Sequence, residues 1–206
     1  MKTISRVILA TILIGLVSCN TDMVDEALVE SPKDITAFQQ YMLDEINLAR
    51  TNPTVYAESR LKPEAESLAD NGSYLYLKKS SPVGALSFNS SLNLSSSKYA
   101  GFLAEKNLMG HNEDGTPLKR AITVGFTGTA IGENIAASSG ETYNALLNAR
   151  SAAIGFVKIM IIDEGVSDLG HRLVMLSSKY KTVGIGYVRN TASTYVNYNV
   201  QNFGNL

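Results

Sequence analysis

The chain has a single cysteine, Cys19, which stands at the end of a short N-terminal segment. The residues that follow contain no thiol, so they can form neither a disulfide nor a zinc ribbon of the Cys-x-x-Cys type. A domain without such cross-links must be stabilised by its hydrophobic core. About 185 residues with ordinary apolar content are enough to build one. The sequence therefore predicts one core-stabilised domain after Cys19.

Residues 1–19 have the layout of a bacterial lipoprotein signal. Lys2 and Arg6 give a basic start, and the apolar run over residues 7–17 is too short to span a membrane comfortably. The closing Leu16-Val17-Ser18-Cys19 resembles the lipobox, after which the cysteine becomes the lipidated first residue. An ordinary cleaved signal with a chance cysteine is the alternative. We expect a protein of the bacterial envelope, on its periplasmic face or at the cell surface, whose membrane partner is the lipid on Cys19.

Charge and composition exclude one class of partner and indicate where the folded domain begins. The formal net charge is −1 and no cluster of Lys and Arg is present, so nucleic acid is not an expected partner. Residues 20–33 are acidic and polar, which is typical of a flexible tether. No later segment has the composition of a linker, and no internal repeat is visible. Residues 34–206 are therefore predicted to form one domain.

The spacing of apolar residues predicts the secondary structure. Helices are expected where apolar residues recur at helical spacing: residues 34–50 with Asp34 as the cap, 53–69, 89–108, 141–162 and 167–178. A strand is the alternative for residues 159–162. Residues 71–82 are expected to form a polar loop, and residues 113–115 a turn. Strands over 182–189 and 193–201, joined by residues 190–192, predict a β-hairpin. This order of elements indicates an α+β fold or a layered α-β-α fold.

The chain has only two histidines, and each follows a glycine, in Gly110-His111-Asn112 and in Gly170-His171-Arg172. Between them lies Gly132-Glu133-Asn134-Ile135-Ala136. Imidazole can bind a metal or move a proton near neutral pH, so these settings suggest one shared site of His111, Glu133 and His171. Zinc accepts imidazole and carboxylate, and three protein ligands with one open position are typical of a catalytic zinc site. If the site is catalytic, Glu133 and His171 are the candidate residues.

Several motifs occur together in a fixed order. They are Asn47-Leu48-Ala49-Arg50; Ala85-Leu86-Ser87-Phe88-Asn89-Ser90-Ser91-Leu92; Leu108-Met109-Gly110-His111-Asn112 with Asp114-Gly115-Thr116-Pro117 and Arg120; Gly132-Glu133-Asn134-Ile135-Ala136; and Gly170-His171-Arg172 with Leu176, Tyr180 and Val183-Gly184-Ile185-Gly186-Tyr187. In this order they resemble the CAP superfamily, the cysteine-rich secretory, antigen 5 and pathogenesis-related domain, in its bacterial form. The resemblance implies a three-layer α-β-α sandwich with a central antiparallel sheet. It also implies a cleft in which two histidines and two acids can hold a divalent cation.

The chain departs from the family pattern in two ways. Its predicted domain lacks the disulfides of the animal and plant members, as is common in bacterial ones. The second acid of the family's tetrad is also missing from the helix that precedes the second histidine, where Ala152-Ala153-Ile154 stands and no carboxylate lies between Glu141 and Asp163. Three acids in the loop leading to His171 are candidate substitutes: Asp163, Glu164 and Asp168.

Three functions fit these observations. A lipid-anchored binding module would hold a small, lipid-like, glycan or peptide ligand, with or without zinc or another divalent metal in the cleft. A metal-dependent hydrolase would need a general base, and the missing acid is the natural candidate for that role. A structural envelope lipoprotein would carry a vestigial site. Glu133 could then accept hydrogen bonds from backbone amides, and His171 could simply begin a helix. The incomplete set of acids favours binding over catalysis.

Overall fold

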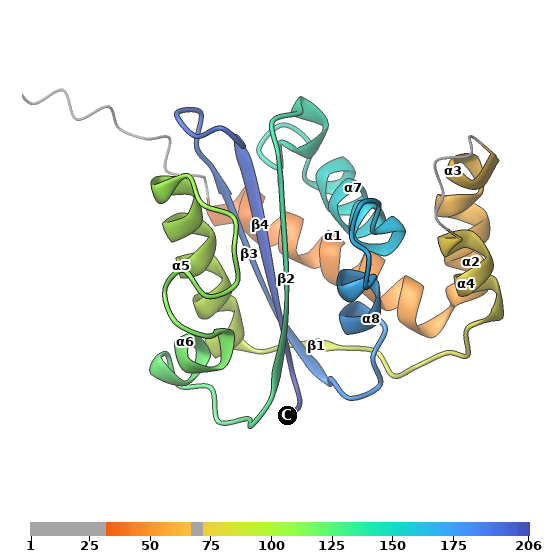
Figure 1. The fold of residues 1–206 in the computed structure, drawn as a ribbon, viewed down its shortest axis with the longest axis horizontal. Coiled ribbons are helices and arrows are strands. Elements are labelled where there is room, and N and C mark those ends of the chain that lie inside the picture. Colours follow the sequence, from red (N-terminus) through yellow and green to blue (C-terminus); the bar gives the residue numbers. More distant parts are fainter. Residues whose placement is uncertain (1–31, 67–71) are drawn as a thin grey trace, which may run out of the picture.

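The computed structural model describes residues 32–66 and 72–206. The predicted lipoprotein signal and the predicted tether up to residue 31 lie outside the described residues. The described part forms three layers, with one sheet between two layers of helices (Figure 1). The predicted α+β class and the α-β-α sandwich are confirmed.

The sheet has the strand order β1-β3-β4-β2. Its three long strands, β2 (Ile131–Ser138), β3 (Thr182–Arg189) and β4 (Asn197–Gly204), are antiparallel as expected. The short edge strand β1 (Ser87–Phe88) instead runs parallel to β3, so the sheet is mixed. This follows from the connection, because the chain passes from β1 directly into the next helix and does not turn back in a hairpin.

Helices α5 (Ser90–Lys106) and α6 (Pro117–Thr123) cover one face of the sheet. Two glycines of β3 let α5 lie directly on the strand. A Cβ atom at Gly184 would lie 2.0 Å from the carbonyl carbon of Leu92, and one at Gly186 would lie 2.2 Å from the backbone oxygen of Ser96. The close approach allows the Ser96 hydroxyl to donate to the Gly184 carbonyl at 3.0 Å. Any side chain at these two positions would push the layers apart.

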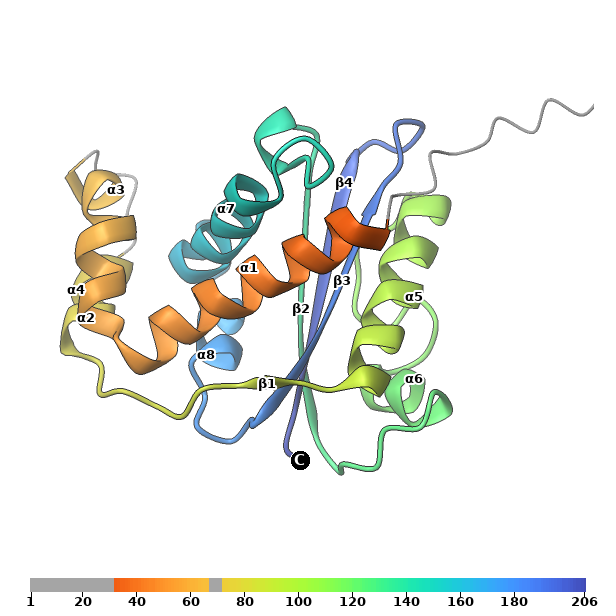
Figure 2. The ribbon, with the colours of Figure 1, turned by 180° about the vertical axis from the view of Figure 1, so that it is seen from behind.

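The opposite face is covered by α1 (Pro32–Thr51), α7 (Ala149–Ile162) and α8 (Gly170–Met175), and α1 crosses in front of the sheet in the view of Figure 2. Phe38 of α1 and Phe156 of α7 pack with Tyr187 of β3 in an aromatic cluster, with ring centroids 4.9 to 6.4 Å apart. The remaining elements are the helices α2 (Pro53–Tyr56), α3 (Lys62–Glu66) and α4 (Ser73–Lys79), a π-helical turn (Ala57–Leu61) and a 3-10 turn (Glu141–Tyr143).

Asn47 and Arg50 explain the motif at the end of α1 in structural terms. The Asn47 amide exchanges two hydrogen bonds with the backbone of Leu86, at 3.0 and 2.7 Å, which fixes the approach to β1. The buried Arg50 guanidinium donates to the carbonyl oxygens of Gly84, Met175, Ser177 and Tyr180. Burial lowers the pKa of Arg50 to about 10, so it stays charged at neutral pH. Both residues bind backbone and hold the fold together.

Strand β4 is buried along its whole length although half of it is polar. Its buried amides are Asn197, Asn199, Gln201 and Asn202. Asn199 donates to the Gly186 carbonyl at 2.8 Å, and Gln201 donates to Asn199. Neither polar atom of the Asn202 side chain has a hydrogen-bond partner among the described residues. In register, Asn202 stands between Glu133 of β2 and Gly184 of β3.

Several expected elements differ from the observed ones. The first helix begins at Pro32, so Asp34 is not its cap. Residues 73–79 form α4 and not a loop, and the helix expected from residue 141 begins at Ala149, where the Asn148 side chain caps it by accepting from the Ser151 amide. Residues 159–162 are helical, and the second hairpin strand begins at Asn197. None of the described helices is long and apolar enough to cross a membrane.

Candidate functional site

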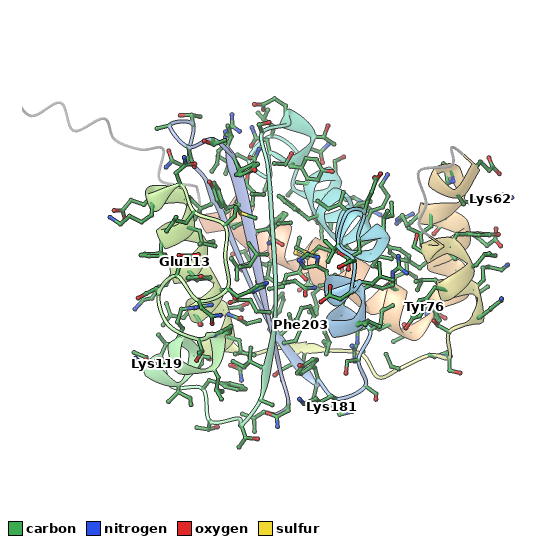
Figure 3. All side chains as sticks on the ribbon, in the orientation of Figure 1. Lys62, Tyr76, Glu113, Lys119, Lys181 and Phe203 are labelled. Carbon is green, nitrogen blue, oxygen red and sulfur yellow. The ribbon has the colours of Figure 1, made fainter. Side chains whose placement is uncertain are left out.

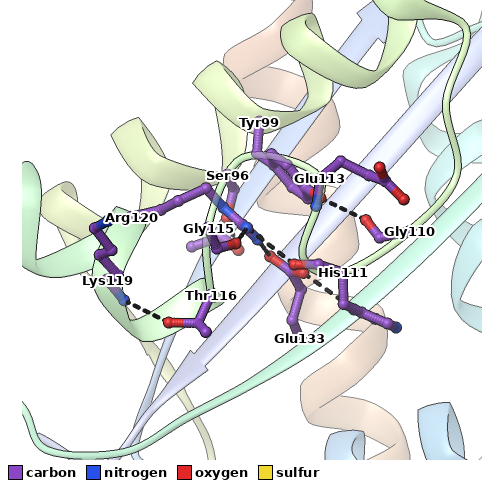
Figure 4. Close-up of polar contacts among 11 residues, drawn as sticks. Ser96, Tyr99, Gly110, His111, Glu113, Gly115, Thr116, Lys119, Arg120 and Glu133 are labelled. Carbon is purple, nitrogen blue, oxygen red and sulfur yellow. Dashed lines mark hydrogen bonds and ion pairs between the residues drawn. The ribbon is translucent and has the colours of Figure 1, made fainter.

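Glu133, on the edge strand β2, is the centre of the first polar cluster. Its side chain is only 1% exposed, and its two oxygens contact different partners. Oε1 lies 3.0 Å from Nδ1 of His111, and Oε2 accepts from Nη2 of Arg120 at 2.5 Å (Figure 4). These partners of the carboxylate are side chains, where the structural alternative predicted backbone amides.

Arg120 is placed by the first turn of α6. The Thr116 side chain caps this helix by accepting from the Lys119 amide at 3.3 Å, and Pro117 occupies its first turn. The guanidinium centre then lies 3.3 Å from the centre of the Tyr99 ring. Its Nη1 donates to the carbonyl oxygens of His111, at 2.9 Å, and Gly115. The cation thus faces an aromatic ring while it binds Glu133 and the loop that carries His111.

Tyr99 fixes that loop from the α5 side. Its hydroxyl donates to the Gly110 carbonyl at 2.5 Å and accepts from the Glu113 amide at 3.2 Å. Burial raises the pKa of Tyr99, and the Glu113 amide and the Arg120 charge oppose only part of this shift. The phenol is therefore neutral at physiological pH and can donate. His111 is positioned by loop contacts while half of its ring stays exposed.

The second cluster pairs His171 with Asp163. Nδ1 of His171 lies 2.6 Å from Oδ1 of Asp163, whose side chain is 1% exposed, and Oδ2 accepts from the Arg172 amide at 3.2 Å. Asp163 is the left-handed residue that ends α7, with a φ of 59°. Arg172 donates from its side chain to the carbonyls of Ile161 and Ile162, at 2.6 and 2.8 Å, which ties the start of α8 to the end of α7.

Of the three candidate substitute acids, only Asp163 contacts a histidine through its side chain. Asp168 is exposed and accepts from the Gly170 amide at 3.1 Å, so it shapes the turn before α8. Glu164 is exposed in the turn that directly follows α7. His171 does begin a helix, as the structural alternative proposed, since α8 starts at Gly170. Its ring nevertheless has a carboxylate partner and is 23% exposed.

Asn134 connects the two clusters through β2. Consecutive strand residues face opposite sides of a sheet, so Glu133 faces α6 and Asn134 faces α8. The buried Asn134 amide donates to the His171 carbonyl at 3.0 Å, while its oxygen has no hydrogen-bond partner among the described residues. The motif around Glu133 therefore holds one histidine by its ring and the other by its backbone.

The pairing sets the chemistry of both imidazoles. An ionised carboxylate only accepts hydrogen bonds, so in a neutral ring the proton lies on Nδ1 and the lone pair on Nε2. Nε2 of His111 and of His171 makes no hydrogen bond to another described residue. Within residues 32–66 and 72–206, no group of three or more His, Cys, Asp or Glu side chains is arranged to hold a metal ion. The three-ligand site of His111, Glu133 and His171 stays a prediction.

Two residues of this site, Tyr99 and Arg120, could not be recognised as site residues from the sequence. Tyr99 lies in the helix predicted over residues 89–108, without a predicted role, and Arg120 was predicted only as part of a motif. The signal for Arg120 was present, because Thr116-Pro117 is a helix start that places residue 120 one turn into α6. Nothing in the local sequence pairs Arg120 with Glu133, since that contact joins a helix to a strand.

Comparison with solved structures supports the fold. An outer surface protein from Borrelia burgdorferi superposes with a TM-score of 0.54 at 14% identity, over 85% of this chain and 95% of that one. An extracellular protein containing an SCP domain, from Bacillus anthracis, superposes with a TM-score of 0.52 at 16% identity, over 83% of this chain. This chain spans 41% of the length of the Bacillus anthracis protein.

No curated protein matches the chain in sequence. Residues 43–203 match the CAP family, described as the cysteine-rich secretory protein family. That range covers more than half of the chain and contains both histidine clusters. The chain belongs to the CAP, or cysteine-rich secretory protein, family.

Proposed function

We propose that this protein is a lipid-anchored binding module of the bacterial envelope whose ligand is held at His111 and His171. The observation that carries the proposal is the pairing of each imidazole with a buried carboxylate, through Nδ1 in both cases. This pairing fixes the ring orientation and leaves Nε2 as the acceptor. A partly exposed histidine of this kind can accept a hydrogen bond from a small, lipid-like, glycan or peptide ligand, or bind a divalent metal.

Imidazole nitrogen is a ligand that zinc and other divalent metals accept. His111 and His171 would hold it through Nε2, and Glu133 and Asp163 would act behind them, because metal-bound histidine usually donates its other ring N–H to a carboxylate. Bound there, the metal would supply a Lewis-acid position for a ligand oxygen or nitrogen. Glu133 itself is an unfavourable ligand, since Arg120 already binds its Oε2.

The occupancy of the carboxylates favours binding over turnover. Glu133 is bound to His111 and Arg120, and Asp163 to His171 and the Arg172 amide. A general base must reach the proton that it removes, and neither of these buried carboxylates is directed to solvent. A metal-dependent hydrolase is therefore the second candidate. The names of the two structural relatives, an outer surface protein and an extracellular protein, support a location outside the cytoplasm.

The metal part of the proposal is tested by elemental analysis of the chain purified without chelators or a histidine tag. We expect zinc in near-stoichiometric amount, lost in the His111→Ala/His171→Ala variant and kept in an Asp168→Asn control, whose position lies in the turn just before α8. Equal metal content in the wild type and the double histidine variant would exclude these rings as ligands.

The choice between binding and hydrolysis needs two further measurements. A screen of lipids, glycans and peptides by thermal shift and native mass spectrometry should find a ligand whose effect is lost with His111→Ala. Zinc-loaded protein should leave ester and peptide libraries intact. Turnover that disappears with His111→Ala would reverse the order of the two candidates, and a screen without any ligand would count against the binding module. Mass spectrometry of the envelope-bound chain tests the lipid on Cys19.

A further inference from the structure

A separate pocket of about 360 Å³ lies between α5 and α6, on the same face of the sheet as Glu133. We call it the α5–α6 pocket, and its lining includes Ser95, Lys98, Tyr99, Lys119, Arg120 and Val124. It lies far from the hollow beside Arg50 and Tyr76, as the positions of Lys119 and Tyr76 on opposite sides of the molecule show (Figure 3). Its volume is at the small end of the range for small-molecule sites.

Two polar groups of this pocket have no hydrogen-bond partner among the described residues. Arg120 commits Nη1 and Nη2 to Glu133 and to the loop of His111, while its buried Nε is left without an acceptor. Ser95 is 2% exposed, and its hydroxyl oxygen is likewise unpartnered. A buried donor without an acceptor is costly, above all on a charged group. Both atoms would gain from a ligand oxygen that is brought within hydrogen-bond distance from the pocket side.

The rim of the pocket is predominantly positive. The Lys98 and Lys119 side chains are exposed, and within the described part of the chain neither forms an ion pair. Asp114 is the one carboxylate among the lining residues that the structure describes. Arg120 is balanced by Glu133, so the two lysines leave the rim with a net positive charge. Val124 and the Tyr99 ring supply an apolar wall beside these groups.

We propose that the α5–α6 pocket binds a phosphate group, either free or as the monoester of a small alcohol. Its oxygens would accept from Nε of Arg120 and the Ser95 hydroxyl, with Lys98 and Lys119 closing over the remaining charge. A single water molecule could satisfy Nε, but it would leave both ammonium groups without an anion. The apolar wall gives an esterified alcohol a surface on which to lie. Phosphate binding here does not require the metal or the ligand proposed for the two histidines.

The test is isothermal titration of the full chain in a phosphate-free buffer at constant ionic strength, with inorganic phosphate in one arm and glycerol 3-phosphate in the other. We expect Lys119→Gln to weaken binding about tenfold and Ser95→Ala about fivefold, the effects of losing one charged and one neutral hydrogen bond. Lys106→Gln is the matched control, because Lys106 is an exposed lysine of α5 outside the pocket. It should leave binding unchanged.

The outcomes separate the two sources of phosphate. Binding in both arms means that free phosphate is sufficient, and binding of glycerol 3-phosphate alone means that the ester is required. The proposal is overturned if neither compound binds at millimolar concentration, or if Lys106→Gln weakens binding as much as Lys119→Gln. Thermal unfolding of each variant checks that it is folded, and Ser95→Ala is expected to stay folded because it removes an unpartnered hydroxyl.

Discussion

Nδ1 of His171 lies 2.6 Å from Oδ1 of Asp163, although the second acid of the family pattern is absent from the helix in which it is expected. Asp163 reaches the histidine because it ends α7 in a left-handed conformation and its side chain then faces the first turn of α8. The carboxylate that pairs with the His171 ring thus comes from the residue that ends α7, because α7 itself contains no acidic residue. His111 is paired with Glu133 in the same way, through the same ring nitrogen.

Asp163→Ala should destabilise the protein by about 1–3 kcal/mol, because it leaves Nδ1 of His171 and the Arg172 amide without their acceptor. Asp163→Asn should cost less, since asparagine tolerates the left-handed backbone and its oxygen can still accept. Urea unfolding of the two variants measures the difference. Equal losses would mean that the charge of Asp163, and not its hydrogen bonds, stabilises the turn.

Arg120→Met should be among the most destabilising single substitutions, at about 3–5 kcal/mol, because it leaves the buried Glu133 carboxylate unpaired. Arg120→Met combined with Glu133→Leu should recover most of that loss, since no buried charge remains. A double-mutant cycle by chemical denaturation gives the interaction energy. Additive losses from the two single variants would refute the importance of this ion pair.

Gly184→Ala should destabilise the protein by several kcal/mol or prevent folding, because the added methyl group would overlap the backbone of α5 at Leu92. Gly101→Ala is the matched control on α5 itself, where a Cβ atom would meet nothing within 4 Å. It should stabilise the helix by about 1 kcal/mol, the usual difference between glycine and alanine. Thermal unfolding of both variants measures the expected loss and the expected gain of stability. A harmless Gly184→Ala would show that the layers can separate.

Stability should fall as the pH rises above about 10, the ordinary pKa of tyrosine. Burial raises the pKa of Tyr56, Tyr99 and Tyr180 in the folded state. The unfolded chain therefore loses these protons first, and the stabilisation that is complete below pH 10 is lost as the pH rises toward the folded pKa values. Denaturation midpoints measured from neutral pH to above pH 10 test whether the stability falls, as expected, and does not rise.

Tyr56→Phe is the control for the alkaline transition. The Tyr56 hydroxyl is buried and has no hydrogen-bond partner among the described residues, so its removal should not destabilise the protein at neutral pH. The same variant should lose less stability than the wild type above pH 10. An unchanged alkaline loss would assign the effect to the other two tyrosines.

The sequence predicted the parts of the fold that have a periodic apolar pattern. Helix α5 and strand β3 were predicted with nearly their observed limits. Helix α4 was missed because it is mostly exposed and buries only Ser73 and Leu77, so it has no apolar stripe. Strand β2 was missed because Gly132, Glu133 and Asn134 are poor strand formers, held in the sheet by pairing with β4.

The sequence also predicted the two histidines and Glu133 as site residues, but it could not predict their partners. The contacts of Glu133 with Arg120 and of Tyr99 with the His111 loop join elements that are separated along the chain. Asp163 was one of three candidate acids, and only the turn between α7 and α8 distinguishes it from Glu164 and Asp168. Such choices depend on tertiary packing, which leaves no local pattern.

The guanidinium of Arg120 divides its donors between two neighbourhoods. Nη1 and Nη2 bind the Glu133 cluster, whereas Nε has no acceptor among the described residues, and the side chain as a whole lines the α5–α6 pocket. An anion that draws the guanidinium toward the pocket would loosen its hold on Glu133 and, through Oε1, alter the environment of His111. Thermodynamic linkage then requires the reverse effect to be equal, so a ligand at His111 would change phosphate affinity by the same factor. Arg120 would then be the side chain through which the two proposed sites influence each other's affinity.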